Sequence, residues 1–166
     1  MQDIFSHTPR KDILSLVKST IYLTLIAELT GIIILSIYWC QKLPLSLAVY
    51  YALFHSVSAF CNAGFSLFPD SLSLYSNSIL INGVICALIV VGGIGFPVLY
   101  DVQSYLKRSE RKRARLSIQT KTVLITTFVL IIGGAIMFGI LENSSLDATA
   151  SFSHQVLISI FQSITC

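Results

Sequence analysis

The chain has 166 residues, of which 54% are hydrophobic and only 11% are charged. Soluble globular domains carry about a quarter charged residues, so this composition excludes an ordinary soluble domain and indicates lipid as the solvent. The four cysteines form no CxxC pair, which argues against a zinc site or a disulfide framework. No secretory signal peptide is expected, because the first ten residues are polar and the first apolar run carries Glu28.

Three segments are apolar and long enough to cross a bilayer, for which roughly 20 residues are needed. They cover residues 19–39, 79–100 and 122–141. The first of them ends with Tyr38 and Trp39, which we expect at the membrane interface. A fourth apolar run, residues 45–60, would reach only about 24 Å as a helix, which is short of the roughly 30 Å hydrocarbon core.

The basic residues test whether residues 45–60 cross the membrane. Residues 1–18 and 101–121 together hold ten of the eleven lysines and arginines. The positive-inside tendency places both regions in the cytoplasm, which requires an even number of crossings between them. A re-entrant segment at 45–60 gives two crossings, whereas a spanning segment gives three. The sequence therefore predicts that residues 45–60 enter the membrane and return.

The loop between the second and third spans is strongly basic. Its candidates for contact with anionic lipid or with a regulatory partner are Lys107, Arg108, Arg111, Lys112, Arg113 and Arg115. A nucleic-acid-binding patch is the alternative interpretation of such a cluster. The spanning segments on both sides favour lipid contact instead, and we expect no nucleic-acid partner.

An internal repeat relates the two halves of the chain. FHSVSA at residues 54–59 recurs as FQSITC at residues 161–166. The spanning helices ahead of the two copies also align, at Lys18, Thr24 and Gly31 with Lys121, Thr127 and Gly134. The pattern predicts one complete unit of spanning helix, short helix and spanning helix over residues 19–100, a basic cytoplasmic loop over 101–121, and a truncated second unit over 122–166.

The run CNAGF follows the short helix and breaks it inside the membrane. Irregular backbone at that depth is tolerated only where protein buries it or water reaches it. Gly64 can adopt a positive φ, so that neighbouring carbonyls can point one way, and several such segments together can replace the water shell of a cation. The C-terminal end of the short helix adds a partial negative charge. The residues alone do not exclude an alternative, namely a hairpin that packs against other helices without conducting ions, as in a membrane enzyme or insertase.

The blocks FHSVSAFCNAGFSLFPDSL, GGIGFPVLYDV and LSIQTKTVLITTFVLIIGGAIMFGILE occur in this order. Together they resemble the ion-conducting subunit of the Trk/Ktr/HKT superfamily of potassium-uptake proteins, over nearly the whole chain. The resemblance implies an all-α integral membrane fold of helix–pore-helix–helix repeats, with pore helix and filter at 45–65, and no enzyme activity or cofactor. The implied filter residues, acting through backbone carbonyls, are Cys61, Asn62, Ala63, Gly64 and Phe65, with potassium (or sodium) bound chiefly at Asn62, Ala63 and Gly64.

The resemblance also implies partners and a location. Members of this superfamily usually pair as dimers, associate with a cytosolic nucleotide-binding regulatory subunit, and lie in the bacterial inner membrane. One filter segment cannot close a selectivity ring, so we expect a fragment or a split reading frame whose other pore units lie elsewhere, in preference to a half-transporter that assembles from several copies. The rival interpretation is a non-transport membrane protein, either an assembly subunit or an enzyme, with the same hairpin.

Several polar residues within the apolar segments have a structural and a functional interpretation. For Glu28 we favour a structural hydrogen bond over contact with the ion pathway, and for Asn82 a hydrogen bond between helices. For His55 we favour a neutral ring that is hydrogen-bonded behind the filter, and for His154 a position near an interface. The glycines at 92–95 precede Pro97 without the context of a nucleotide-binding loop, and they predict a kink and close helix packing.

Overall fold

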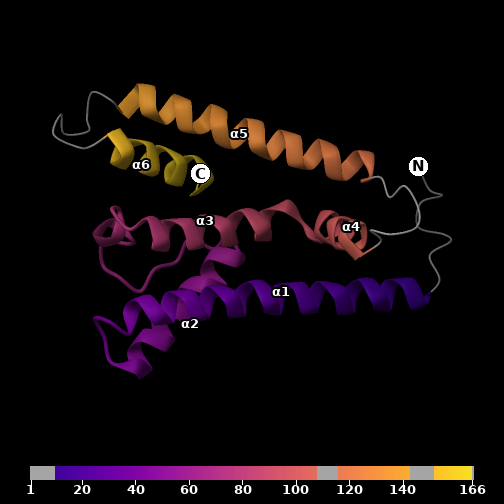
Figure 1. The fold of residues 1–166 in the computed structure, drawn as a ribbon, viewed down its shortest axis with the longest axis horizontal. Helices are drawn as coiled ribbons and strands as arrows, with labels where there is room; N and C mark the ends of the chain where they lie inside the picture. The colour runs from indigo at the N-terminus through magenta and orange to yellow at the C-terminus, as the bar shows by residue number, and fades with distance from the viewer. Residues whose placement is uncertain (1–9, 108–115, 143–151, 166) are drawn as a thin grey trace.

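The structure, a computed structural model, describes residues 10–107, 116–142 and 152–165. Within these ranges all regular structure is helical, namely α1 (Arg10–Trp39), α2 (Leu45–Phe60), the 3₁₀ turn η1 (Ser73–Tyr75), α3 (Ile79–Ile94), α4 (Phe96–Lys107), α5 (Ile118–Glu142) and α6 (Phe152–Thr165). Figure 1 shows α1, α3 and α5 running side by side, with the short helix α2 beside α1 and α6 beside α5. The all-helical fold that the sequence predicted is confirmed.

Two helices are each long and apolar enough to cross a membrane, over Leu16–Trp39 in α1 and Ile118–Leu141 in α5. A third span exists only if α3 and α4 are counted together, and their axes differ in direction by 98°. The segment 79–100 is therefore not one continuous helix. α3 stops where Gly95 adopts a φ of 89°, and Pro97 has no amide hydrogen with which to continue the helix.

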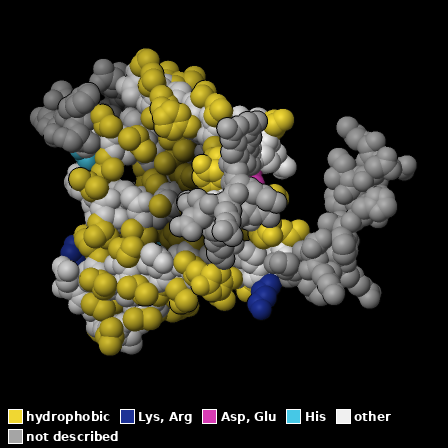
Figure 2. Space-filling model, turned by 45° about the vertical axis from the view of Figure 1, so that its right-hand side comes forward, with side chains coloured by type: hydrophobic (Ala, Val, Ile, Leu, Met, Phe, Trp, Pro, Cys, Tyr) yellow, Lys and Arg dark blue, Asp and Glu magenta, His cyan; other side chains and the backbone are white. Residues whose placement is uncertain are grey.

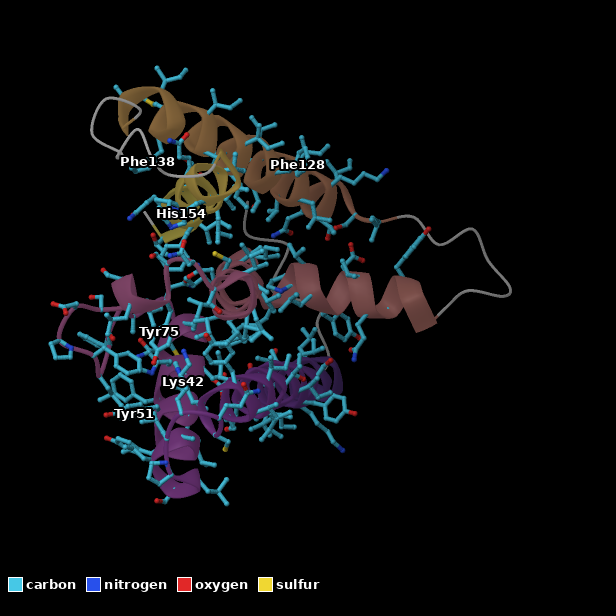
Figure 3. All side chains as sticks on the ribbon, turned by 60° about the vertical axis from the view of Figure 1, so that its left-hand side comes forward. Lys42, Tyr51, Tyr75, Phe128, Phe138 and His154 are labelled. Carbon is cyan, nitrogen blue, oxygen red and sulfur yellow. The ribbon has the colours of Figure 1, made fainter. Side chains whose placement is uncertain are left out.

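The chain that follows α2 returns to the side from which α2 started. The ring of Tyr75 lies 6.2 Å from that of Tyr38, near the end of α1. The Lys42 ammonium lies 5.7 Å from the centre of the same Tyr75 ring. Figure 3 shows Lys42, Tyr51 and Tyr75 gathered at one end of the molecule. The chain after α2 thus folds back toward the end of α1, and the entry of residues 45–60 into the membrane stays a prediction.

Trp39 is the centre of the core of the first unit. Its side chain is fully buried, and four rings have centroids within 6.3 Å of its own, those of Tyr51, His55, Phe68 and Tyr75. Trp39 is therefore a core residue and not an exposed anchor, and its depth at the membrane interface stays a prediction. α2 and the returning segment fold over the end of α1, and they convert an expected surface anchor into a core residue. Tyr38 is half-buried at the edge of the same cluster.

The outer faces of the helices are apolar. Exposed large hydrophobic side chains on α1 and α5 include Ile21, Leu29, Ile33, Phe128, Ile136 and Leu141. Figure 2 shows hydrophobic atoms over both halves of the molecule, and Figure 3 shows Phe128 on α5. Exposure of this extent is unfavourable in water and is typical of a surface that faces lipid or another protein in the membrane. The chain is an integral membrane protein.

The two short helices are attached to the spanning helices before them by the same hydrogen bond. Ser56 Oγ on α2 donates to the Glu28 carbonyl on α1 at 2.9 Å. Ser163 Oγ on α6 donates to the Ile131 carbonyl on α5 at 2.8 Å. Both the donors and the acceptors occupy aligned positions of the sequence repeat. The two helix pairs are therefore two copies of one packing arrangement.

Aligned glycines make this close crossing possible. A Cβ atom placed on Gly31 would lie 2.6 Å from Ser56 Oγ, and one placed on Gly134 would overlap Ser163 Oγ. Because only hydrogen occupies these positions, each serine reaches the backbone of the helix that it crosses. Small residues commonly permit such approaches between membrane helices.

A hydrogen-bonded cluster joins α4 to the start of α5. One carboxylate oxygen of Asp101 accepts from Thr120 Oγ1 at 2.6 Å and from the Ser117 amide at 2.9 Å. On the other side of α4, Ser19 Oγ of α1 donates to Gln103 Oε1 at 2.9 Å. These contacts fix the direction in which α4 leaves the break at Gly95.

Candidate functional site

The backbone after α2 turns in a left-handed conformation. The amides of residues 61–63 still donate to carbonyls in the last turn of α2. Asn62 then has a φ of 53° and Gly64 a φ of 70°. Asparagine is one of the few residues besides glycine that adopt this region readily. The helix therefore ends in a tight turn, and residues 61–65 are exposed along it.

The carbonyl groups of this segment differ in what they contact. Within the described ranges, no donor is hydrogen-bonded to the carbonyl oxygens of residues 61–64. The carbonyl of Phe65 accepts a hydrogen bond from Ser58 Oγ at 2.9 Å. A Cβ atom on Gly64 would meet no atom within 4 Å, so this position faces open space. Within the described chain, the carbonyl groups of four of the five predicted filter residues thus accept no hydrogen bond.

His55 lies behind this segment, with 2% of its surface exposed. Its Nδ1 lies 2.8 Å from the Tyr51 carbonyl, while its Nε2 lies 3.2 Å from Ser66 Oγ and 3.4 Å from the Leu67 amide nitrogen. A carbonyl only accepts and an amide only donates, so the proton is on Nδ1 and Nε2 is the acceptor. The ring is neutral, as we expected for a histidine behind the filter.

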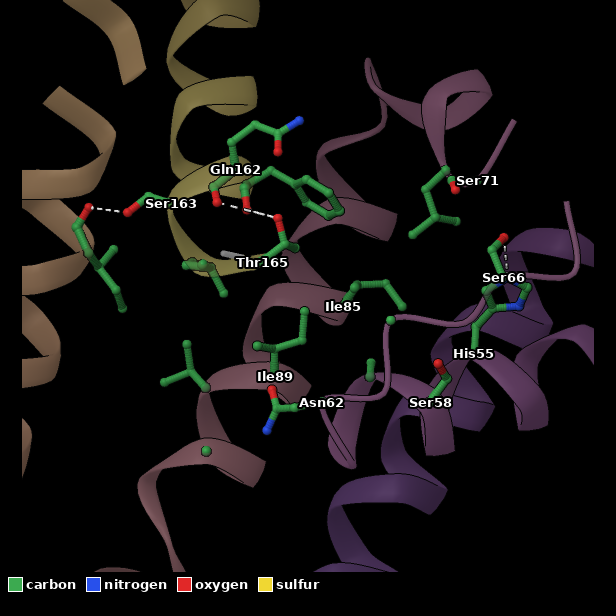
Figure 4. Close-up of a pocket in the computed structure, with 18 of the residues that line it drawn as sticks. His55, Ser58, Asn62, Ser66, Ser71, Ile85, Ile89, Gln162, Ser163 and Thr165 are labelled. Atoms are coloured by element: carbon green, nitrogen blue, oxygen red, sulfur yellow. Dashed lines mark hydrogen bonds between the residues drawn. The ribbon is translucent and has the colours of Figure 1, made fainter. Parts of the chain in front are cut away.

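A cavity of about 760 Å³ opens beside the segment. α2 and the turn after it contribute Ser58 and Asn62, the C-terminal end of α6 contributes Gln162 and Thr165, and α3 contributes Ile85 to the wall between them. Figure 4 shows these residues around the cavity, and Figure 2 shows a hollow between the two halves of the molecule. The structure thus brings the ends of both short helices to one space.

The electrostatics of this space favour a cation. No Asp, Glu, Lys or Arg side chain is among the described residues that line it. The C-terminal end of an α-helix carries a partial charge of about −0.5, and the C-terminal end of α2 reaches the cavity. The open carbonyls of residues 61–64 add further negative dipoles at one wall. A cation could be held here by the backbone alone, without a carboxylate ligand.

Glu28 and Asn82 do not line this cavity. Glu28 is half-buried on α1, and its backbone carbonyl is the group that contacts α2 through Ser56. Asn82 is 4% exposed and donates from Nδ2 to the carbonyls of Tyr75 and Ser76. The hydrogen bond between helices predicted for Asn82 is therefore wrong. Its partners lie in the loop before α3, where they close the returning segment onto its own helix.

The basic residues predicted to contact lipid or a regulatory partner are mostly outside the described ranges. Lys107 is the last residue of α4. The others, Arg108, Arg111, Lys112, Arg113 and Arg115, are not among the described residues. His154 is half-buried near the start of α6.

Two contacts at the site were not predicted from the sequence. Gly92 of α3 lies against the end of α2, where a Cβ atom would overlap the Phe60 carbonyl oxygen. The sequence marked this glycine as a packing position but did not name its partner. Ser58, which binds Phe65, was not singled out, although the repeat places a second hydroxyl, that of Thr165, at the aligned position. The recurrence of a hydroxyl group at this position of the repeat could have marked Ser58 as a functional residue.

Comparison with known proteins agrees with this architecture. The TrkH family, described as a cation transport protein, matches residues 7–164. The Ktr system potassium uptake protein B of Vibrio alginolyticus is 37% identical over 150 residues, which are 89% of this chain and 32% of that protein. The protein of the same name from Bacillus subtilis is 36% identical over 156 residues, with 92% and 34% covered.

A third relative carries a broader name. The potassium/sodium uptake protein NtpJ of Enterococcus hirae is 31% identical over 153 residues, which are 90% of this chain and 33% of that protein. The chain spans about a third of the length of these curated relatives. The family match covers nearly all of the chain and agrees with the resemblance carried by its filter-like motif. The chain belongs to the TrkH family of cation transport proteins.

Proposed function

We propose that this chain supplies part of a pore through which monovalent cations cross the membrane, with potassium as the main ion. The observation that carries the proposal is the convergence of α2, the segment 61–65 and the end of α6 on one cavity. Two of the relatives are named potassium uptake proteins and one a potassium/sodium uptake protein. This family is one of transport proteins, in line with the expectation that the chain is not an enzyme.

The proposed mechanism is passage down an electrochemical gradient through a ring of backbone carbonyls. A cation that leaves water must find replacement oxygen atoms at once, because dehydration without them is prohibitive. In this proposal the carbonyls of Asn62, Ala63 and Gly64 supply one part of the ring, with Cys61 and Phe65 at its edges. Further units supply the remaining parts, and the end of α6 marks where the next filter segment begins.

The assembly around this pore part is also a proposal. The word "system" in the names of two relatives indicates that those proteins work with other components. We infer a dimeric complete protein in the bacterial inner membrane, with the N-terminus and the loop 101–121 in the cytoplasm. The basic residues from Lys107 to Arg115 then face a cytosolic nucleotide-binding subunit or anionic lipid.

The test compares two glycines that both have open space around them but differ in backbone conformation and in position, since only Gly64 lines the cavity. A Cβ atom added to either Gly64 or Gly83 would meet no other atom within 4 Å, but Gly64 has a φ of 70° whereas Gly83 lies within α3. A left-handed conformation costs a non-glycine residue about 1–2 kcal/mol. Gly64→Ala therefore strains the segment and projects a methyl group into the open space, while Gly83→Ala leaves the site unchanged.

Uptake of potassium is measured in cells that lack their own potassium uptake and produce the complete protein containing this chain. We expect Gly64→Ala to lower uptake by about tenfold, which corresponds to about 1.4 kcal/mol, and Gly83→Ala to retain it. Uptake that survives Gly64→Ala unchanged would reject the filter. A complete protein that moves neither potassium nor sodium would favour the rival interpretation, a membrane protein with a packed hairpin.

A further inference from the structure

A single hydroxyl group satisfies both backbone polar groups of Phe65. Ser58 Oγ donates to the Phe65 carbonyl at 2.9 Å and accepts from the Phe65 amide at 3.0 Å. Ser58 lies on the last turn of α2 and is 8% exposed. The chain at Phe65 has no neighbouring strand that would supply such partners in a sheet. The serine hydroxyl takes that role and ties the far end of the filter segment to the pore helix.

His55 binds the residues that come next. Its Nε2 accepts from Ser66 Oγ and from the Leu67 amide, and its ring stacks on Phe68 with the centroids 5.1 Å apart. On a helix, positions three apart lie on the same face, so His55 and Ser58 present their polar atoms to the segment side by side. Figure 4 shows both side chains, with Ser66 close to His55.

We propose that Ser58 and His55 form a filter clamp that holds the carbonyls of residues 61–64 in place and thereby sets the preference between potassium and sodium. The inference rests on the proposed function. The two residues act through the backbone of the segment, so they are positioning residues. The left-handed turn at Asn62 and Gly64 fixes where the segment leaves α2, and the clamp fixes where it ends. Discrimination between cations depends on the carbonyl arrangement that the ion meets.

The repeat supplies independent support for this role. The residues aligned with His55 and Ser58 are Gln162 and Thr165, and both line the same cavity. Threonine keeps the hydroxyl group. Glutamine, like a neutral histidine, can donate at one atom and accept at another. Both units therefore place the same hydrogen-bonding capacity on the same face of the short helix.

The test uses these aligned residues as conservative variants. Ser58→Ala removes the clamp, whereas Ser58→Thr and His55→Gln copy the second unit. Ser56→Ala is the matched control, because Ser56 is a fully buried serine on the same helix whose hydroxyl binds α1 and not the filter segment. In the complete protein, competition between sodium and potassium in an uptake assay gives the preference for potassium.

We expect Ser58→Ala to lower the preference for potassium by about tenfold, which corresponds to about 1.4 kcal/mol. The two conservative variants should keep most of it, and Ser56→Ala should keep the ratio even if less protein is inserted. An unchanged ratio in Ser58→Ala overturns the clamp, as does an equal loss in Ser56→Ala. If Ser58→Ala does not accumulate in membranes, Ser58→Cys keeps the shape with a weaker donor, and an unchanged ratio in that variant overturns the clamp.

A second measurement separates the clamp from the proposed function. Hydrogen exchange at the Phe65 amide reports directly on its bond to Ser58, whether or not the protein transports. Exchange should accelerate in Ser58→Ala and remain slow in Ser56→Ala. Absence of any cation uptake by the unmodified protein, together with this exchange pattern, rejects the pore. Uptake with equally slow exchange in both variants rejects the clamp alone.

Discussion

The contact between Gly92 and the end of the pore helix provides a sharp test of the structure. A Cβ atom at this position would overlap the Phe60 carbonyl oxygen and lie 2.9 Å from the Phe60 carbonyl carbon. Both atoms belong to the backbone, so no side-chain rotation can relieve the overlap. Gly92→Ala must push the end of α2 away from α3. This is the point at which the proposed filter segment begins.

The size of the effect follows from the distance. The carbonyl carbon of Phe60 must move from 2.9 Å to at least 3.4 Å from the new methyl group, where ordinary van der Waals contact begins, and the carbonyl oxygen, which lies closer still, must move farther. Overpacking of this kind costs about 1–3 kcal/mol. Two other glycines of α3 serve as controls, because a Cβ atom on Gly83 would have nothing within 4 Å and one on Gly93 would have only Nδ2 of the Asn62 side chain, at 3.6 Å. All three alanine variants share the same gain in helix propensity, so their differences report the contact.

The measurement is the thermal stability of the purified complete protein in detergent, combined with potassium uptake in cells. We expect Gly92→Ala to be less stable than Gly83→Ala by about 1–3 kcal/mol and to lose uptake. Gly93→Ala should behave like Gly83→Ala. If Gly92→Ala is as stable and as active as the two controls, α3 does not support the end of the pore helix, and the arrangement described for the site is incorrect.

Two further predictions concern the core of the first unit and the link at α4. Trp39→Ala should destabilise the protein by about 3–5 kcal/mol, because the side chain is fully buried. Ile37→Ala is the control, since Ile37 is 63% exposed and its replacement should change the melting temperature little. Equal changes in the melting temperature of the two variants would contradict the buried position of Trp39. Asp101→Asn removes the charge that strengthens the bonds from Thr120 and Ser117. Faster hydrogen exchange at the Ser117 amide is expected, and an unchanged rate would show that this bond does not form in the membrane.

The turn of the chain after α2 could be predicted from the sequence, because the features that indicate it are either local or can be counted along the chain. The length of the apolar run 45–60, the count of basic residues on either side and the break at Gly64 each constrain the path without knowledge of contacts. The repeat predicted that Gly31 and Gly134 are equivalent, and the structure places both at a crossing with a serine. These predictions required only spacing, charge and the conformational freedom of glycine.

Other features depended on which groups meet in space. Trp39 closes an apolar run in the manner of an interfacial residue, yet the returning segment buries it fully. Asn82 is a polar residue in an apolar segment, which is typical of a hydrogen bond between helices, yet its Nδ2 donates to the carbonyls of Tyr75 and Ser76. The sequence near Ser58 does not predict that its hydroxyl group is hydrogen-bonded to Phe65, because this bond forms only when the chain turns back after α2.

The sequence by itself determined the solvent, the number of apolar segments and the repeat, and it predicted that the chain turns back after residue 60, since hydrophobicity and charge act along the chain whatever its final packing. The tertiary structure decided that the ends of α2 and α6 share one cavity, that α3 bends away at Gly95, and that Ser58 and His55 of α2 bind the backbone of Phe65 and Leu67. The physical reason is that hydrogen bonds and close packing join groups distant in sequence. Their partners are fixed only when the helices meet.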